Sequence, residues 1–430
     1  MSLRPLRAVW LCAALYGLAP PAFALAPQAG TPLSLDEARQ LAEARAPQIS
    51  ASRAQADAAR NMAVAAGQLP DPVLKLGVNN LPISGEAGWS VTREGMTMRS
   101  VGLMQELTRS TKREARSARA LREADMAQAN EDLARLAARR DAALAWLDVA
   151  WFDSMREQLE RQLGELTLQQ QAAESAFRAG RDTQAALVAS QLAIGRSQDQ
   201  LSAMQRDVAM ARARLSRFIG ADAERAVIAP EGSAAPTGWQ LERALAALDQ
   251  HPSQTLANRR IAFADADAGV ARENRMPDVA VELMYSQRGP GFANMVSVNL
   301  SMPLPWDRAH RQDRELGASL ARVNQAEAER EDAAREYRAA LIEAQAAWQA
   351  NCQRLARYDE SLVPLAGQQV EAALAAYRAG TAPLASVLEA RRMLIDTRME
   401  RQRAGLDAAR SRVQLEFLDP LATPVQGEKP

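Results

Sequence analysis

The chain has 430 residues, of which 47% are hydrophobic, 24% charged and only 4% aromatic. Basic and acidic residues balance at 52 each, so the charge gives no reason to expect nucleic acid or another polyanion as a partner. The abundance of Ala, Arg, Gln, Glu and Leu is typical of long helices rather than of a compact mixed domain.

Residues 1–24 have the three parts of a secretory signal peptide. Arg4 and Arg7 are basic, Ala8 to Leu18 is a short apolar run, and Ala22-Phe23-Ala24 fits a small-x-small cleavage site. We therefore predict an exported protein whose mature chain starts near Leu25. The alternative is a buried N-terminal helix.

After the predicted signal, the sequence allows no internal disulfide and no helical membrane span. Cys12 lies within the predicted signal, so Cys352 is the one cysteine of the mature chain and no internal disulfide is possible. Cys352 sits in a helical pattern, where a lone cysteine is usually a small buried apolar residue. No later stretch reaches 18 apolar residues, so a role within a membrane would have to come from strands.

The first predicted repeat, residues 25–220, opens with two short helices and a pair of strands. The helices span Leu35–Pro47 and Pro47–Leu69. Leu74, Leu76 and Val78 alternate with polar or small residues, which indicates a strand with one apolar face. A less regular return strand covers Met96–Leu107.

A long helical hairpin follows in the same repeat. No proline occurs between Pro82 and Pro230, and apolar residues recur at three- and four-residue spacings. This pattern predicts a helix over Thr111–Phe177, roughly 100 Å long at ~1.5 Å per residue. Gly180 ends that helix, and a second helix over Thr183–Ile219 returns beside it. No compact domain houses such a helix, so it belongs to a coiled-coil or tubular assembly.

The second predicted repeat, residues 238–418, follows a linker over 221–237 and precedes a tail over 419–430. Its elements are helices over Leu241–Pro252 and Pro252–Met276, strands around Val279–Tyr285 and Val296–Met302, and helices over Trp306–Tyr377 and Ala385–Phe417. Pro364 lies inside the long helix and is expected to kink it.

Matching motifs identify the two halves as copies of one unit. Phe177-Arg178-Ala179-Gly180 returns 200 residues later as Tyr377-Arg378-Ala379-Gly380. Pro70-Asp71 precedes the first strand pair and Pro277-Asp278 precedes the second. Several such coincidences in the same order indicate an internal duplication.

The four strands are predicted to be about nine to eleven residues long, which is the length that a membrane β-strand needs. The alternative is a small soluble β-layer that caps the helices. Four strands cannot close a barrel, which takes about eight, and an open edge cannot face lipid. If these strands cross a membrane, several chains must share one barrel.

Over nearly the whole predicted mature chain, the sequence resembles the outer-membrane efflux (TolC-like) family. The resemblance is carried by short motifs in the family's order: Leu35-Asp36-Glu37-Ala38, Leu69-Pro70-Asp71-Pro72, Gln105-Glu106-Leu107 followed by Thr111-Lys112-Arg113, Val363-Pro364-Leu365-Ala366, and Tyr377-Arg378-Ala379-Gly380. The Gln-Glu pair is similar to the heavy-metal branch. That branch has a Pro- and Gly-rich turn where this chain has Thr108-Arg109-Ser110.

The resemblance implies a mainly α-helical fold with a small β part. Three identical chains would share a 12-stranded β-barrel in the outer membrane, and their long hairpins would form an α-helical tube across the periplasm. Each long helix would lie beside two shorter helices stacked end to end. The resemblance also implies a periplasmic adaptor and an inner-membrane RND-type pump as partners, with heavy-metal cations or drugs as the cargo.

By the same resemblance, the hairpin turns form the periplasmic tip, where the channel narrows and docks its adaptor. The residues assigned to this tip are Arg178, Ala179, Gly180, Arg181, Asp182, Arg378, Ala379, Gly380, Thr381 and Leu384. Ordinary helix capping is the alternative, and it explains the two glycines but not the recurrence of Arg-Ala-Gly.

Related channels carry two acidic residues shortly after the second turn, and these form rings that narrow the pore and attract cations. Here Glu389 keeps the pattern and Ser386 departs from it, which predicts one carboxylate ring per trimer. Ala189 and Ala186 occupy the matching positions of the first repeat, so the charge comes from the second repeat alone. The alternative is a solvated glutamate on a helix face.

No motif of a catalytic, cofactor or metal site occurs, so we predict a protein that is not an enzyme and has no cofactor. His251 and His310 are expected to be surface or capping residues. Six methionines lie in or near the strands and could contact a soft metal, but packing or lipid contact is the expected role. The competing function is a periplasmic coiled-coil scaffold or adaptor without a pore, which would have no use for strand pairs.

Overall fold

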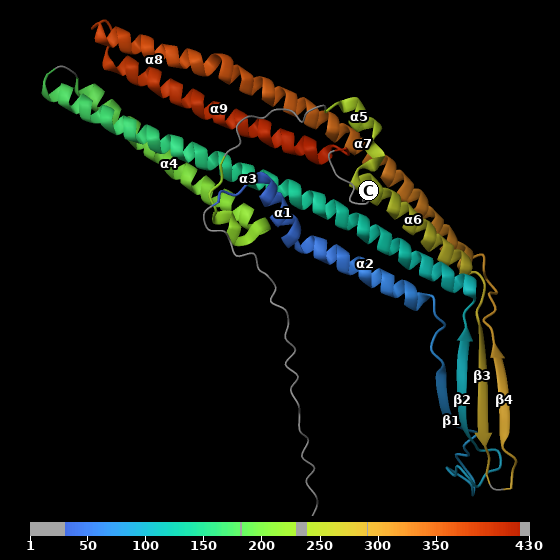
Figure 1. Cartoon of the computed structure of the whole chain (residues 1–430). Coiled ribbons are helices and arrows are strands. Elements are labelled where there is room, and N and C mark those ends of the chain that lie inside the picture. The colour runs from blue at the N-terminus through green and yellow to red at the C-terminus, as the bar shows by residue number, and fades with distance from the viewer. Residues whose placement is uncertain (1–30, 181–182, 229–238, 290, 422–430) are drawn as a thin grey trace, which may run out of the picture.

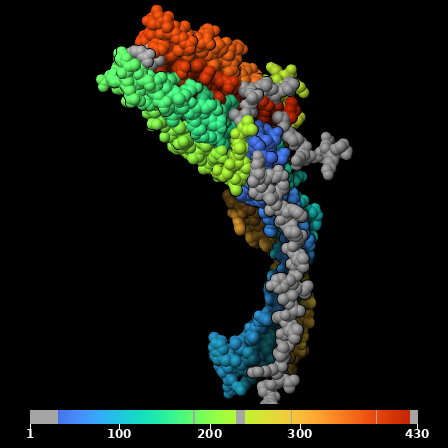
Figure 2. All heavy atoms as spheres, turned by 60° about the vertical axis from the view of Figure 1, so that its left-hand side comes forward, coloured from blue at the N-terminus to red at the C-terminus, as the bar shows by residue number. Residues whose placement is uncertain are grey.

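The computed structural model describes residues 31–180, 183–228, 239–289 and 291–421. The predicted signal, Arg181 and Asp182 of the tip, most of the linker and most of the tail lie outside this part of the chain. Long helices run side by side to one end of the molecule, and a narrow sheet extends from the other end (Figures 1 and 2).

The elements follow one another in the same order in both halves. The first half contains α1 (Leu35–Arg45), α2 (Pro47–Ala66), β1 (Val73–Asn79), β2 (Met98–Leu107), α3 (Ser110–Arg178) and α4 (Gln184–Ile219). The second contains α5 (Leu241–Ala246), α6 (Pro252–Glu273), β3 (Val279–Gln287), β4 (Met295–Ser301), α7 (Gln312–Arg357), α8 (Val363–Arg378) and α9 (Leu384–Leu418). One-turn 3-10 helices follow α4 and α5.

Each long helix is flanked by two shorter helices placed end to end, as the resemblance implied. In the first half α3 packs against α2 near the sheet and against α4 toward the hairpin turn (Figure 1). In the second half α6 packs on α7, and α9 packs on α7 and α8. Contacts of α3 with α6 and α9 join the halves.

The main core lies where α1, α3, α4 and α9 meet. Alanines and two tryptophans, Trp146 and Trp151, dominate it, so the helices approach closely. Gly405 of α9 is an example, because a Cβ atom there would lie 2.7 Å from the Trp151 ring. Asp148 on α3 is buried beside Arg410 on α9, whose Nε donates to it at 2.9 Å. Burial raises the pKa of Asp148 although Arg410 opposes the shift.

The four strands form one antiparallel sheet in the order β1-β2-β3-β4. Its register places the residues on two contrasting faces. The apolar face carries Leu74, Leu76, Val78, Val101, Leu103, Leu283, Tyr285, Val296, Val298 and Leu300, which are 44% to 74% exposed. The polar face carries Lys75, Asn79, Met98, Ser100, Gly102, Met104, Glu106, Glu282, Met284, Ser286, Met295, Ser297 and Asn299.

Two of the strands are shorter than the sequence pattern predicted. β1 and β4 have seven residues each, whereas β2 has ten and β3 has nine. β1 ends where Asn80 takes a positive φ of 55°, and β4 ends two residues before Pro303. A proline lacks the N–H group that would extend the ladder.

Two predicted helix features are wrong in detail. The helix expected from Trp306 begins at Gln312, because residues 306–311 form turns instead. The N–H of Trp306 donates to the carbonyl of Leu304 at 2.9 Å, and the N–H of Asp313 donates to the carbonyl of Arg308 at 2.9 Å. The helix expected over Leu241–Pro252 breaks after Ala246 into a 3-10 turn over Leu248–Gln250.

Pro364 lies at an irregularity of the long helix, where a kink is expected. A π-helical turn over Tyr358–Leu362 precedes it, and α8 continues from Val363 with Pro364 in its first turn. The wider turn accommodates both the missing N–H group and the proline ring. A π-helical turn is one of the ordinary causes of a helix kink, so the irregularity is consistent with the prediction.

Candidate functional site

The turns of the two hairpins lie together at the end of the molecule farthest from the sheet (Figure 1). The structure therefore brings the two Arg-Ala-Gly segments, 200 residues apart in sequence, to the same end. Of the predicted tip residues it describes Arg178, Ala179, Gly180, Arg378, Ala379, Gly380 and Thr381, and it places Leu384 as the first residue of α9.

The second turn closes α8 with a Schellman motif. Gly380 has a φ of 73°, and its N–H donates to the carbonyl of Tyr377 at 3.0 Å. The N–H of Thr381 donates to the carbonyl of Ala376 at 3.0 Å, so two carbonyls at the helix end are satisfied. Its hydroxyl donates to the same oxygen.

The first turn uses the same glycine geometry. Gly180 has a φ of 67° and donates to the carbonyl of Phe177 at 2.9 Å. A side chain would find open space at either glycine, so the requirement there is backbone conformation rather than packing. Capping explains both glycines. Capping does not require an arginine at position 178 or 378, and both side chains are exposed. Arg178 forms an ion pair with Glu174.

A groove of about 340 Å³ lies between the hairpins, a few turns from their ends. It is lined by residues of α3, α4 and α9, which include Gln162, Glu165, Gln169, Ala189, Arg196, Ser197, Leu388, Glu389, Arg391, Arg392 and Asp396. The groove therefore contains the predicted constriction residue Glu389 and, across from it, the alanine at the matching position of the first half.

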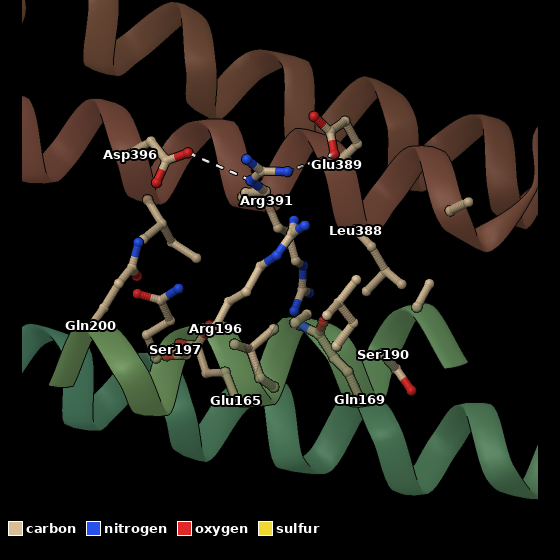
Figure 3. A pocket seen from close by; sticks show the side chains of 18 residues that line it. Glu165, Gln169, Ser190, Arg196, Ser197, Gln200, Leu388, Glu389, Arg391 and Asp396 are labelled. Carbon is tan, nitrogen blue, oxygen red and sulfur yellow. Dashed lines mark ion pairs between the residues drawn. The ribbon is translucent and has the colours of Figure 1, made fainter. Parts of the chain in front are cut away.

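Glu389 belongs to a short acidic and basic row along α9. Arg392 lies between two carboxylates, 3.9 Å from Glu389 and 3.7 Å from Asp396. Dashed lines at Glu389 and Asp396 in Figure 3 mark these two ion pairs. Burial raises the pKa of Asp396, Arg392 opposes the shift, and Glu400 and Glu389 add to it. The sequence reasoning missed Arg392 and Asp396, although their spacing of three and seven residues from Glu389 puts them on one helix face.

Ser386, the second predicted constriction residue, lies near the start of α9. Its hydroxyl donates to the carbonyl of Pro383 at 2.7 Å, in the first turn of α9. The hydroxyl is therefore used by its own helix. Figure 3 also shows two arginines that extend into the groove from opposite sides, Arg196 from α4 and Arg391 from α9.

The two histidines have the surface and capping positions that were expected. His310 is exposed and contacts Asp307. His251 caps α6, and its side chain is buried. The strand methionines Met98, Met104, Met284 and Met295 lie on the polar face of the sheet.

Two features of the described residues bear on metal and membrane roles. Within residues 31–180, 183–228, 239–289 and 291–421, no three His, Cys, Asp or Glu side chains cluster as a metal site. No helix among the same residues is both long and apolar enough to span a membrane.

In a comparison with known proteins, one family matches both halves of the chain. The family described as outer membrane efflux protein matches residues 38–221 and 245–419. No curated protein matches the chain.

Three solved structures illustrate the likeness in fold. The transmembrane channel protein CusC has a TM-score of 0.75 at 15% identity, covering 89% of this chain and 91% of that one. VceC, an outer membrane protein from Vibrio cholerae, has a TM-score of 0.73 at 17% identity, with coverage of 89% and 95%. The Campylobacter jejuni outer membrane channel CmeC has a TM-score of 0.76 at 13% identity, with coverage of 92% and 87%.

Proposed function

From the premise that this chain belongs to the outer membrane efflux protein family, we propose that three copies assemble into one channel that passes cargo from the periplasm to the outside. Membership makes the protein an outer-membrane channel of a tripartite efflux system, rather than an adaptor without a pore. The family and its structural neighbours are channels and not enzymes.

The exposed apolar face and the one-sided edges of the sheet are the observations that support an assembly of several chains. Its apolar face exposes Leu76 at 74% and Leu300 at 73%, together with neighbouring leucines and valines. A contiguous surface of this kind marks a contact with lipid or protein. Within the described residues, β1 and β4 each pair on one side only. In lipid both edges must be paired, which requires further copies of the sheet.

The number of copies follows from barrel size. About eight strands are the fewest that close, so at least two copies are needed, and three give the 12 strands that the family resemblance implies. With the apolar face toward lipid, the polar faces line a shared lumen. The long hairpins then continue the wall of the tube into the periplasm.

The hairpin ends are proposed as the docking surface for a periplasmic adaptor that connects to an inner-membrane RND-type pump. Their proximity at one end and the repeated exposed arginines support this assignment. The proposed docking residues are Arg178, Ala179, Gly180, Arg181, Asp182, Arg378, Ala379, Gly380, Thr381 and Leu384. Glu389 is proposed as the pore constriction, accompanied by Ser386, and heavy-metal cations or drugs as the cargo.

The proposed organisation of the chain is a signal over 1–24, repeats over 25–220 and 238–418, a linker over 221–237 and a tail over 419–430. It is supported by the repeated element order.

Reconstitution tests this function. Protein extracted from the outer-membrane fraction is expected to insert into planar lipid bilayers and give discrete current steps. Protein that fractionates with the soluble periplasm and gives no current in bilayers would contradict the proposal.

A further inference from the structure

One ion pair on the polar face of the sheet crosses a whole strand. Lys75 on β1 lies directly opposite Gly102 on β2. The Nζ atom of Lys75 is nevertheless 3.0 Å from Oε2 of Glu282, which lies on β3. The lysine side chain therefore runs diagonally over the backbone of β2.

Gly102, directly opposite Lys75 on β2, has no side chain on this face. A Cβ atom at Gly102 would lie 3.1 Å from the carbonyl oxygen of Leu283 and 3.3 Å from the Cβ atom of Met284. The missing side chain, rather than a turn or a bend, is what position 102 contributes.

The charges on this face are few, which makes their pairing consequential. In the described strands the polar face carries three charged residues, Lys75, Glu106 and Glu282. The side chain of Glu282 is 14% exposed and that of Lys75 is 40% exposed, so the carboxylate is the more buried partner of the pair. Glu106 accepts a 3.4 Å hydrogen bond from the Thr108 hydroxyl, and the structure gives it no ion pair.

We propose that Lys75 neutralises Glu282 on the inner wall of the channel, so that this level of the wall does not select its cargo by charge. Three uncompensated carboxylates around a lumen would attract cations and repel anions, as acidic rings do in cation channels. An ammonium group at 3.0 Å from each carboxylate cancels that field at a short distance. Loss of Lys75 converts the level of Glu282 into a cation-selective ring.

The inference rests on the proposed function, because the polar faces of several copies must line one lumen. The test therefore reads lumen exposure and local charge separately. Lys75→Cys is made in a Cys352→Ala background, so that the mature protein has one cysteine. Reconstituted protein is treated with two membrane-impermeant methanethiosulfonates, one with a trimethylammonium group and one with a sulfonate.

In Lys75→Cys the Glu282 carboxylate is uncompensated, so the cationic reagent is expected to react faster than the anionic one. Adding Glu282→Gln should lower the ratio of the two rates by about tenfold, at the low end of the rate effects of charged clefts. Glu106→Gln is the matched control. It removes the same charge from the same face without touching Lys75, and it should lower the ratio much less. An equal effect of the two substitutions would overturn the inference.

The reciprocal variant covers the case in which Lys75→Cys does not fold. In Glu282→Cys the lysine remains, so the anionic reagent should react faster, and Lys75→Met should remove that preference. If Lys75→Met leaves the rate ratio of Glu282→Cys unchanged, Lys75 does not set the charge at this level and the inference is wrong.

Leu76→Cys, on the apolar face, separates failure of the inference from failure of the proposed function. It is expected to resist both reagents because it faces lipid. Reaction at Leu76→Cys together with protection of Lys75→Cys would reverse the proposed orientation of the sheet, and the channel assignment would fail with it. Reaction at Lys75→Cys with a rate ratio that ignores Glu282 would reject the inference alone.

Discussion

The two halves of the chain use the same scaffold and differ where they are expected to act. Both supply two strands, a long helix and a glycine-closed turn. In the groove between the hairpins, however, the second half presents Glu389 and Asp396 where the first presents Ala189 and Arg196. The duplicated features follow from backbone and packing requirements. The unequal positions are therefore the ones to test for function.

At the sheet the two halves should respond alike, and the expected effect is the largest. Leu76→Lys in the first half and Val298→Lys in the second each place a charge on the apolar face. Each should destabilise the inserted protein by about 2–4 kcal/mol, the cost of a lysine at the middle of a bilayer. The yield of oligomer from outer membranes measures the loss.

Ser297→Lys is the matched control, because it adds the same charge one residue away on the polar face. It should leave the yield close to that of the unmodified protein. Equal losses from Val298→Lys and Ser297→Lys would mean that the apolar face does not contact lipid.

The N-termini of α2 and α6 differ between the halves. Substitution at the start of α6 should therefore lower the free energy of unfolding more than substitution at the start of α2. His251 caps α6: its Nδ1 accepts from the backbone N–H of Ser253 at 3.2 Å and its Nε2 contacts the carbonyl of Phe417 at 3.1 Å. Ala46 precedes α2 at the matching place and makes no such cap. His251→Ala should lower the free energy of unfolding by about 2 kcal/mol, as loss of a strong cap does.

The same histidine predicts a pH dependence. Burial lowers the pKa of His251, although its bond to Phe417 opposes the shift. A histidine with a depressed pKa stabilises the fold fully above its ordinary value of about 6.5, and this stability is lost as the pH falls through the folded-state pKa. Melting temperatures should therefore fall more between about pH 7 and about pH 5 in the parent protein than in His251→Asn. Parallel curves for the two proteins would refute this role.

At the turns the halves should again respond alike, with a smaller effect. Gly180→Ala and Gly380→Ala each force a side chain into the left-handed region, which costs about 1–2 kcal/mol per residue. Open space around both glycines leaves no further packing cost. Chemical denaturation should show similar losses at the two positions, and a loss at one position alone would show that the turns are not equivalent.

In the groove the halves should differ most clearly in function and least in stability. Glu389→Ala removes an exposed carboxylate and should change stability by less than about 0.5 kcal/mol. It should weaken block of single-channel current by added divalent cations. Ala189→Glu adds a carboxylate at the matching place and tests whether the position or the half matters. Unchanged block and gating in Glu389→Ala would reject the constriction role.

Much of the scaffold follows from patterns that are local in the sequence. The absence of proline over residues 83–229 and the apolar stripe led to a predicted helix over Thr111–Phe177, and α3 spans Ser110–Arg178. Proline and glycine likewise indicated where most of the predicted helices begin or end. The helix start at Trp306 was wrong because helical composition continues through residues 306–311, which form turns.

The candidate sites depend on contacts that spacing does not reveal. Glu389 was found through a family motif, whereas the groove around it requires knowing that α9 lies against α3 and α4. Lys75 and Glu282 are 207 positions apart, and their pairing depends on the register of three strands across Gly102. Such pairs become visible only when the sheet is assembled.

The number of chains in the assembly tests the proposed channel most directly, because the barrel, the lumen and the tip all depend on it. Native mass spectrometry of protein extracted from the outer membrane, combined with bilayer recordings of the same sample, should give a species of three chains that conducts. A conducting species of a single chain would contradict the account, since four strands cannot enclose a lumen.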